Sequence, residues 1–169
     1  QHFGQMLRDA VQQVESGKCG ACIFGYEVQD PTAYGVVEFD ESGKVLSLEE
    51  KPKTPKSNYA IPGLYFYDSS VCDKAALLEP SARGEYEITD LNKVYLQEGQ
   101  LQVKLFERGF AWLDTGNCDS LLDAGNFIAT IQNRQGFYVS CIEEIAWRNG
   151  WISNDDLRAL GKEMEKTSY

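Results

Sequence analysis

Hydrophobic residues at the start of the chain recur with helical spacing. Leu7, Ala10, Val11 and Val14 fall on one helical face, and Gly17 follows them as a natural C-cap. The pattern predicts an amphipathic helix that ends near this glycine.

Apolar and aromatic runs then predict strands. Residues 21–28, 34–39 and 44–48 are rich in apolar and β-branched side chains, and the turn sequence 40–43 separates the last two runs. We expect these strands to form a meander. A further short strand is predicted over the aromatic residues 63–67.

The middle of the chain carries both helix and strand signals. A helix is predicted from about Ser70 until Pro80 stops it, and a second helix is predicted to begin with Thr89 as its N-cap. Strands are expected at 101–106 and around Trp112.

The last third of the chain predicts helices. An amphipathic helix is indicated by five apolar residues at helical spacing, whose face we expect to be buried in the core. These residues are Leu121, Leu122, Phe127, Ile128 and Ile131. Ser140 with Glu143, and Ser153 with Asp156, match the capping-box pattern, so each pair is predicted to begin a short helix.

The mixture of strands and helices lacks a regular βαβ spacing. It therefore predicts an α/β or α+β architecture with a mixed sheet. No internal repeat or low-complexity linker is present in the sequence, so we expect one domain body with small appended helices.

Charge and hydropathy narrow the classes of partner. The 169-residue chain has a formal net charge of -10 at pH 7 and no run of Lys or Arg, which argues against a nucleic-acid partner. No apolar stretch approaches the roughly 20 residues that span a bilayer, and the first residues lack the pattern of a signal peptide. We therefore expect no membrane partner and a cytoplasmic location.

The five cysteines are odd in number and scattered, which indicates reduced thiols rather than a disulfide framework. Cys19 and Cys22 form a CxxC pair. A zinc site needs a second pair, and a redox CxxC opens a helix, whereas an apolar run follows here. We interpret the pair as ordinary thiols.

Several kinds of catalysis lack the residues that they need. The single histidine, His2, stands at the start of the chain, so Ser-His-Asp and Cys-His schemes have no credible base. Neither G-x-x-x-x-G-K-[ST] nor G-x-G-x-x-G is present, so the sequence contains no recognisable cradle for nucleotide phosphates.

Polar side chains at the ends of predicted strands are the remaining candidates for a binding site. In Glu50-Lys51-Pro52, the Lys ammonium suits a phosphate and the Glu carboxylate suits the hydroxyls of a sugar. The alternative is a solvated surface ion pair before a proline turn, and the spacing alone favours that alternative.

Two further candidates are equally ambiguous from local sequence. Arg83, beside Gly84, suits a phosphate, but its loop also suits acidic residues that stabilise a helix N-terminus. Asp114 follows an apolar run and suits Mg²⁺, which commonly takes one or two carboxylates plus substrate phosphates. A lone Asp at such a position is more often a turn or cap residue.

Taken in order, several segments closely resemble the glucose-1-phosphate thymidylyltransferase family, and the resemblance extends over nearly the whole chain. The segments are YGVVEF at 34–39, LEEKP at 48–52, GLYFYD at 63–68, SARGE at 81–85, EITD at 87–90, WLDTG at 112–116 and EEIA at 143–146. The Glu-Lys-Pro and Leu-Asp-Thr-Gly segments also occur in related sugar nucleotidylyltransferases.

The resemblance implies an enzyme that joins glucose 1-phosphate to dTTP with Mg²⁺ and releases pyrophosphate. This reaction is the first step of dTDP-rhamnose and related deoxysugar synthesis. The implied fold is a three-layer α/β/α sandwich around a mixed sheet, of which this chain is the later half. Residues 1–139 are expected to belong to the nucleotidyltransferase core and 140–169 to appended helices.

The family's functional residues carry over to matching positions. The implied sugar-phosphate contacts are Tyr34, Gly35, Glu50, Lys51, Ile61, Tyr65, Arg83 and Trp112. Lys51, Arg83 and Asp114 are the implied catalytic residues, and Asp114 is implied to be one of two carboxylates on Mg²⁺. An effector site for dTTP or dTDP-sugars at a subunit contact of a homotetramer is also implied. Its matching residues are Gly4, Arg108, Glu144, Ile145 and Arg148.

The family's glycine-rich phosphate loop, base-reading residues and second metal carboxylate have no counterpart in this sequence. We therefore expect a fragment that is inactive by itself, and whose bared sheet edge and apolar helix face promote association. Two alternatives stay open. The chain is a non-catalytic module that binds sugar phosphate or effector, or it derives from a related transferase that uses UTP.

Overall fold

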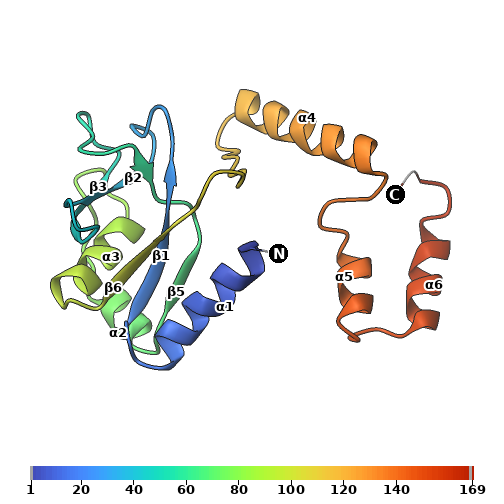
Figure 1. Cartoon of the computed structure of the whole chain (residues 1–169), viewed down its shortest axis with the longest axis horizontal. Helices are drawn as coiled ribbons and strands as arrows, with labels where there is room; N and C mark the ends of the chain where they lie inside the picture. The colour runs from blue at the N-terminus through green and yellow to red at the C-terminus, as the bar shows by residue number, and fades with distance from the viewer. Residues whose placement is uncertain (1, 168) are drawn as a thin grey trace. The chain divides into compact units, whose positions relative to one another are not determined.

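The computed structural model describes residues 2–167 and 169 (Figure 1). The chain divides into two compact units, Gln1–Trp112 and Leu113–Tyr169, which are described separately. The expected boundary between a core and appended helices after residue 139 stays a prediction.

The first unit contains the sheet and three helices. Its elements are α1 (His2–Glu15), β1 (Ala21–Glu27), β2 (Gly35–Phe39), β3 (Val45–Glu50), β4 (Tyr59–Ala60), β5 (Tyr65–Tyr67), α2 (Val71–Ala76), α3 (Ile88–Gln97) and β6 (Leu101–Leu105). The predicted helix and strand segments are confirmed with small shifts at their ends. The strand expected around Trp112 is not formed there, because this residue and its neighbours are in irregular backbone.

Strand β1 is the centre of a mixed sheet. β6 pairs with it in parallel along Ala21–Gly25, whereas β5 pairs antiparallel with Ala21–Ile23 and β4 with Tyr26 and Glu27. β6 therefore lies along one edge of β1. The opposite edge of β1 is shared by β4 and β5. The mixed sheet is confirmed.

The expected meander is wrong in part. β2 and β3 do form an antiparallel pair, but β2 reaches the sheet through β4, where Val36 pairs with Ala60, and not through β1. The hydrophobic pattern locates strands but does not specify which of them pair, and β4 is too short to show a pattern of its own.

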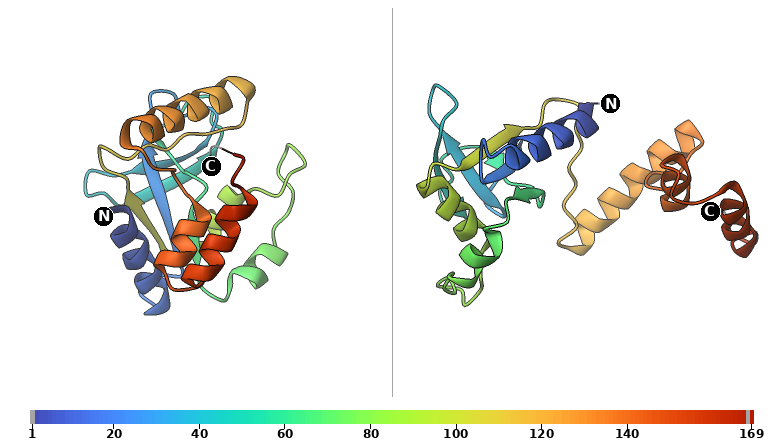
Figure 2. Two further views of the ribbon diagram at one scale, coloured as in Figure 1. Left: turned by 90° about the vertical axis from the view of Figure 1, so that its right-hand side faces the viewer. Right: turned by 90° about the horizontal axis from the view of Figure 1, so that it is seen from below.

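Helices cover both faces of this sheet (Figures 1 and 2). Side chains alternate along β1, so that Cys22 and Phe24 pack on one face with Ala10 of α1. On the opposite face Ala21 packs with Leu91 of α3. Apolar residues therefore fill both interfaces, and the three-layer α/β/α arrangement expected from the resemblance is confirmed.

Two helix ends differ from the sequence prediction. α2 ends at Ala76, four positions before Pro80, so the proline does not stop it directly. α3 begins at Ile88 with Glu87 as its N-cap, and no side chain caps it. Thr89 is therefore not the cap, because its hydroxyl bonds to a residue on another element.

The second unit is helical and contains α4 (Cys118–Gln135), α5 (Ile142–Arg148) and α6 (Asn154–Glu163). α5 and α6 pack side by side (Figure 2). The Ser153–Asp156 capping box at α6 is confirmed in both of its hydrogen bonds. The Ser140–Glu143 box is wrong, because Cys141 is the N-cap of α5 and makes no side-chain cap bond.

Helix α4 is confirmed, but the burial of its apolar face is not. Leu121 is 59% exposed and Leu122 is 63% exposed, and Ala124 is the one buried residue of this helix within the described chain. The spacing of apolar residues predicts a face but not what covers it. None of the helices in the described residues has the length and apolar character to cross a membrane.

Candidate functional site

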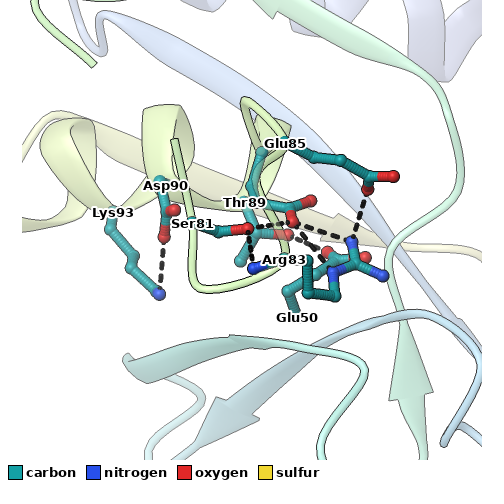
Figure 3. Close-up of polar contacts among 8 residues, drawn as sticks. Glu50, Ser81, Arg83, Glu85, Thr89, Asp90 and Lys93 are labelled. Carbon is teal, nitrogen blue, oxygen red and sulfur yellow. Dashed lines mark hydrogen bonds and ion pairs between the residues drawn. The ribbon is translucent and has the colours of Figure 1, made fainter. Parts of the chain in front are cut away.

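The carboxylate of Glu50 is held between two strands and a helix. Glu50 ends β3 and pairs with Gly35 at the start of β2. Its Oε2 accepts a hydrogen bond of 2.5 Å from the hydroxyl of Thr89, in the first turn of α3 (Figure 3). Because Thr89 is buried and Glu50 is half-buried, this bond fixes one oxygen of the carboxylate.

Gly35 leaves no free space beside this pair. A Cβ atom built on Gly35 would lie 3.0 Å from Oγ1 of Thr89 and 3.2 Å from Oε2 of Glu50. The carbonyl of Gly35 also accepts a 2.8 Å hydrogen bond from the backbone N–H of Ile61. The structure therefore brings Gly35, Glu50 and Ile61 together.

Tyr65 lies near the same carboxylate. It is half-buried on β5, and burial, with a smaller contribution from the negative charge of Glu50, raises the pKa of its phenol. The phenol therefore stays protonated at neutral pH and is able to donate a hydrogen bond.

Lys51 follows Glu50 in a strained conformation. Its φ of 44° lies in the left-handed region, which is costly for a residue with a Cβ. Its backbone N–H donates 2.9 Å to the carbonyl of Tyr34, while its side chain is exposed. Within the described chain no carboxylate lies within ion-pair distance of its ammonium, although its charge contributes to lowering the pKa of Glu87.

Arg83 is held by two carboxylates in the loop before α3. Its Nη2 lies 2.7 Å from Oε1 of Glu87 and 3.1 Å from Oε2 of Glu85 (Figure 3). Ser81 donates a further 2.8 Å bond to Oε1 of Glu87. These bonds, Arg83 first and Ser81 second, lower the pKa of Glu87 and keep it ionised, and the bond to Glu87 raises the pKa of Arg83.

The segments that contain Glu50 and Arg83 line one cavity of about 630 Å³. Its lining residues are Glu49, Glu50, Pro52, Lys53, Thr54, Ser81, Ala82, Arg83, Glu87, Asp90 and Lys93. Both Glu50 and Arg83 therefore reach the same open space, whereas Lys51 and Tyr65 are not among the residues that line it. Lys93 is already paired with Asp90 at 2.7 Å.

Tyr34 and Trp112 are also brought together in the first unit. Their rings meet edge-on, with centroids 5.0 Å apart. Trp112 lies in a similar edge-on contact with Tyr26, at 5.7 Å. A second cavity of about 360 Å³, largely apolar, opens beside Trp112.

Asp114 belongs to the second unit. Its exposed carboxylate accepts a 3.2 Å hydrogen bond from the backbone N–H of Gly116, as a turn residue does. Among the described residues no group of three or more His, Cys, Asp and Glu side chains is arranged to hold a metal ion.

The implied effector residues are divided between the two units. Glu144 and Arg148 of α5 form an ion pair of 2.5 Å, and together with Ile145 they line a cavity of about 410 Å³. Gly4 is in α1, and Arg108 lines a separate cavity of about 270 Å³ in the first unit.

Comparisons with known proteins identify the family. Residues 1–131 match the family model for nucleotidyl transferases. The chain belongs to the nucleotidyl transferase family. This nucleotidyl transferase chain is 61% identical to a glucose-1-phosphate thymidylyltransferase of Mycolicibacterium smegmatis, and 50% identical to one of Neisseria gonorrhoeae.

Each of these alignments covers 99% of the chain but 58% of the relative, so the chain spans little more than half the length of these relatives. A solved structure of a putative glucose-1-phosphate thymidylyltransferase from Bacillus anthracis, in complex with a sucrose, is also similar. It has a TM-score of 0.63 and 40% identity, over 72% of this nucleotidyl transferase chain and 48% of that one.

Sequence reasoning missed two residues that organise the site of this nucleotidyl transferase. Thr89 was assigned to a helix cap, although it holds Glu50, and Glu87 received no role, although it is 8% exposed and pairs with Arg83. The four-residue spacing of Arg83 and Glu87 is a signal for their pairing. No local signal links Thr89 to a residue 39 positions earlier.

Proposed function

We propose that the chain is the sugar-1-phosphate-binding part of a glucose-1-phosphate thymidylyltransferase. That enzyme makes dTDP-glucose and pyrophosphate from dTTP and glucose 1-phosphate, as the first step of dTDP-rhamnose and related deoxysugar synthesis. The names of relatives that are 46 to 61% identical support this assignment. The observation that carries it is the cavity onto which the carboxylate of Glu50 and the guanidinium of Arg83 both open.

The sugar contacts follow from the acceptors and donors around Glu50. With one oxygen engaged by Thr89, the carboxylate of Glu50 keeps its other oxygen for the hydroxyls of a hexose. The protonated phenol of Tyr65 is a donor beside it, and the hydrogen bond from the N–H of Ile61 to the carbonyl of Gly35 holds their backbone next to this carboxylate. Tyr34 and Trp112 supply an aromatic wall.

The phosphate contacts are the two cations that flank this carboxylate. Lys51 has no carboxylate partner within the described residues, so its ammonium is free to act as a point charge on the phosphate. Arg83 offers a planar fork, and its exposed partner Glu85 is easily displaced by a phosphate. Glu87 stays bound and sets the direction of the guanidinium.

These roles suit an in-line displacement at phosphorus. An oxygen of the sugar phosphate attacks the α-phosphorus of the nucleoside triphosphate, the new P–O bond forms, and pyrophosphate leaves. The chain's own contribution is to hold the attacking phosphate in line and to neutralise its charge, without a covalent nucleophile. Lys51 and Arg83 are the residues that we propose for this task.

The metal proposal rests on Asp114. One oxygen of its exposed carboxylate bonds to a backbone N–H, and the carboxylate remains accessible. A single accessible carboxylate fits Mg²⁺, which is usually held by one or two carboxylates together with phosphates and water. When bound, Mg²⁺ supplies charge neutralisation at the transferring phosphate. Asp114 alone is an incomplete site, so we propose that a second carboxylate comes from outside this sequence.

The sequence has no glycine-rich loop to cradle the triphosphate. We therefore propose that the isolated chain binds glucose 1-phosphate but does not turn over. The choice between dTTP and UTP depends on base-reading residues outside the sequence. We further propose that the protein is a cytoplasmic homo-oligomer with an effector site. The residues proposed for that site are Gly4, Arg108, Glu144, Ile145 and Arg148.

Calorimetry on the purified chain tests the proposal. We expect glucose 1-phosphate to bind and dTTP to give no heat at the active site. Heat from dTTP or dTDP-rhamnose that is lost in Arg148→Gln would report binding at the proposed effector site. No heat from glucose 1-phosphate, or dTDP-glucose formation by the chain alone, would contradict the proposal.

A further inference from the structure

A row of stacked tyrosine rings begins at Tyr65, beside the proposed sugar subsite. Tyr65 and Tyr67 are successive same-face residues of β5, and their rings stack with centroids 6.1 Å apart and planes 16° apart. Tyr67 stacks in turn on Tyr95 of α3, at 5.5 Å and 28°. The position of the Tyr65 ring therefore depends on the ring of Tyr67 that is stacked against it.

The hydroxyl of Tyr67 is held by a buried amide side chain of α3. Asn92 of α3 is 0% exposed, and its Oδ1 accepts a 2.6 Å hydrogen bond from the hydroxyl of Tyr67. The other end of the same side chain is unsatisfied, because Nδ2 has no hydrogen-bond partner in the described part of the chain. A buried donor without a partner destabilises a fold, whereas a leucine of similar volume would carry no such donor.

The bond to Tyr67 is therefore the contact that accounts for an amide at position 92. Thr89 lies one helical turn earlier on α3 and holds Glu50, the carboxylate whose charge reaches Tyr65. One buried face of α3 thus holds both sides of the subsite, the carboxylate through Thr89 and the tyrosine stack through Asn92.

We propose that Asn92 is a positioning residue for sugar-phosphate binding, because it orients Tyr67 and through it the phenol of Tyr65. The inference rests on the proposed function, in which Tyr65 contacts the sugar phosphate. Asn92 does not touch the ligand itself, since it is fully buried.

Three variants separate positioning from a purely structural role. Tyr67→Phe and Asn92→Leu remove the two ends of the same hydrogen bond while keeping most of the packed volume. Tyr95→Phe is the matched control. It removes a hydroxyl from the same stack, but that hydroxyl bonds to Asp68 at 3.1 Å and not to Asn92.

The readouts are the ring resonances of Tyr65 in the ligand-free chain, by NMR with labelled tyrosine, and the calorimetric affinity for glucose 1-phosphate. We expect Tyr67→Phe and Asn92→Leu to shift the Tyr65 resonances and to weaken binding about fivefold, the effect of one neutral hydrogen bond. Tyr95→Phe should lower stability yet change neither quantity.

Unchanged Tyr65 resonances in both Tyr67→Phe and Asn92→Leu would overturn the inference. So would shifted resonances in a chain whose affinity for glucose 1-phosphate stays the same. If the native chain gives no heat with glucose 1-phosphate while Asn92→Leu still moves Tyr65, then Asn92 orients the tyrosine stack and it is the proposed function that fails.

Discussion

The hydroxyl of Thr89 donates to the carboxylate of Glu50 at 2.5 Å, and thereby joins the first turn of α3 to the end of β3. The bond spans 39 positions of sequence, and Gly35 lies against both partners. It determines which oxygen of Glu50 remains free, so the orientation of the proposed sugar-binding carboxylate depends on a threonine that sequence analysis assigned to a cap.

Removing the hydroxyl of Thr89 should destabilise the fold. Thr89→Val keeps the side-chain shape but leaves the half-buried carboxylate of Glu50 without its donor, so we expect a loss of about 1–3 kcal/mol in the free energy of unfolding. Urea denaturation measures this loss. Thr130→Val is the control, because Thr130 is exposed and its hydroxyl bonds to the carbonyl of Asn126 in its own helix. Equal losses in the two variants would contradict the role of Thr89.

Gly35 should not tolerate a side chain. The methyl group of Gly35→Ala would lie 3.0 Å from Oγ1 of Thr89, so we expect a destabilisation of about 1–3 kcal/mol from overpacking. In a Thr89→Ala background that oxygen is absent, and the two losses should not add. Gly63→Ala, where no atom lies within 4 Å, is the control. Strict additivity of the two changes would show that the clash is not with Thr89.

The thiols should differ sharply in reactivity. Burial raises the pKa of Cys22 to about 11 and also raises the pKa of Cys19, whereas Cys72 and Cys118 are exposed. Because the thiolate is the reactive form, we expect iodoacetamide at about pH 8 to label Cys72 and Cys118 first. Mass spectrometry of digests identifies the sites. Rapid labelling of Cys22 in the native chain would show that the CxxC pair is accessible after all.

Acid should weaken the loop that holds Arg83. The pKa of Glu87 is lowered from its ordinary value of 4.5, chiefly by Arg83. A lowered carboxyl pKa contributes stability that is complete above the unfolded pKa and is lost as pH falls through the lower folded pKa. We therefore expect this contribution to fade below about pH 4.5.

A carboxyl titration by NMR with labelled glutamate measures that pKa directly. Arg83→Met removes the largest cause and should raise the pKa of Glu87, and Ser81→Ala should raise it less. A pKa of Glu87 that is the same in Arg83→Met as in the native chain would mean that the ion pair does not form in solution.

The local elements of the fold were accessible from sequence. Helical spacing in α1 and the apolar runs of β1 to β3 depend on near neighbours only, so their positions were predicted well. The pairing of β2 with β4 was not, because a strand of two residues carries no period. The exposed apolar face of α4 shows a further limit, since spacing does not report what covers a face.

The candidate site divides in the same way. Glu50, Lys51 and Arg83 are singled out by local sequence, but the shared cavity of Glu50 and Arg83 comes from the topology. The left-handed φ of Lys51 has no signature in a residue that precedes proline. Asp114 as a metal ligand stays a prediction, because nothing in the geometry of its own turn distinguishes it from a turn residue.

The most direct test of the account is the affinity of the chain for glucose 1-phosphate in two charge-matched variants. Lys51→Gln removes the proposed phosphate contact, and Lys44→Gln removes the same charge from an exposed turn residue that does not line the cavity of Glu50 and Arg83. We expect calorimetry to show binding weakened about tenfold or more in Lys51→Gln, the effect of one charged hydrogen bond, and unchanged in Lys44→Gln. Equal affinities in the two variants would contradict the proposed sugar-phosphate site.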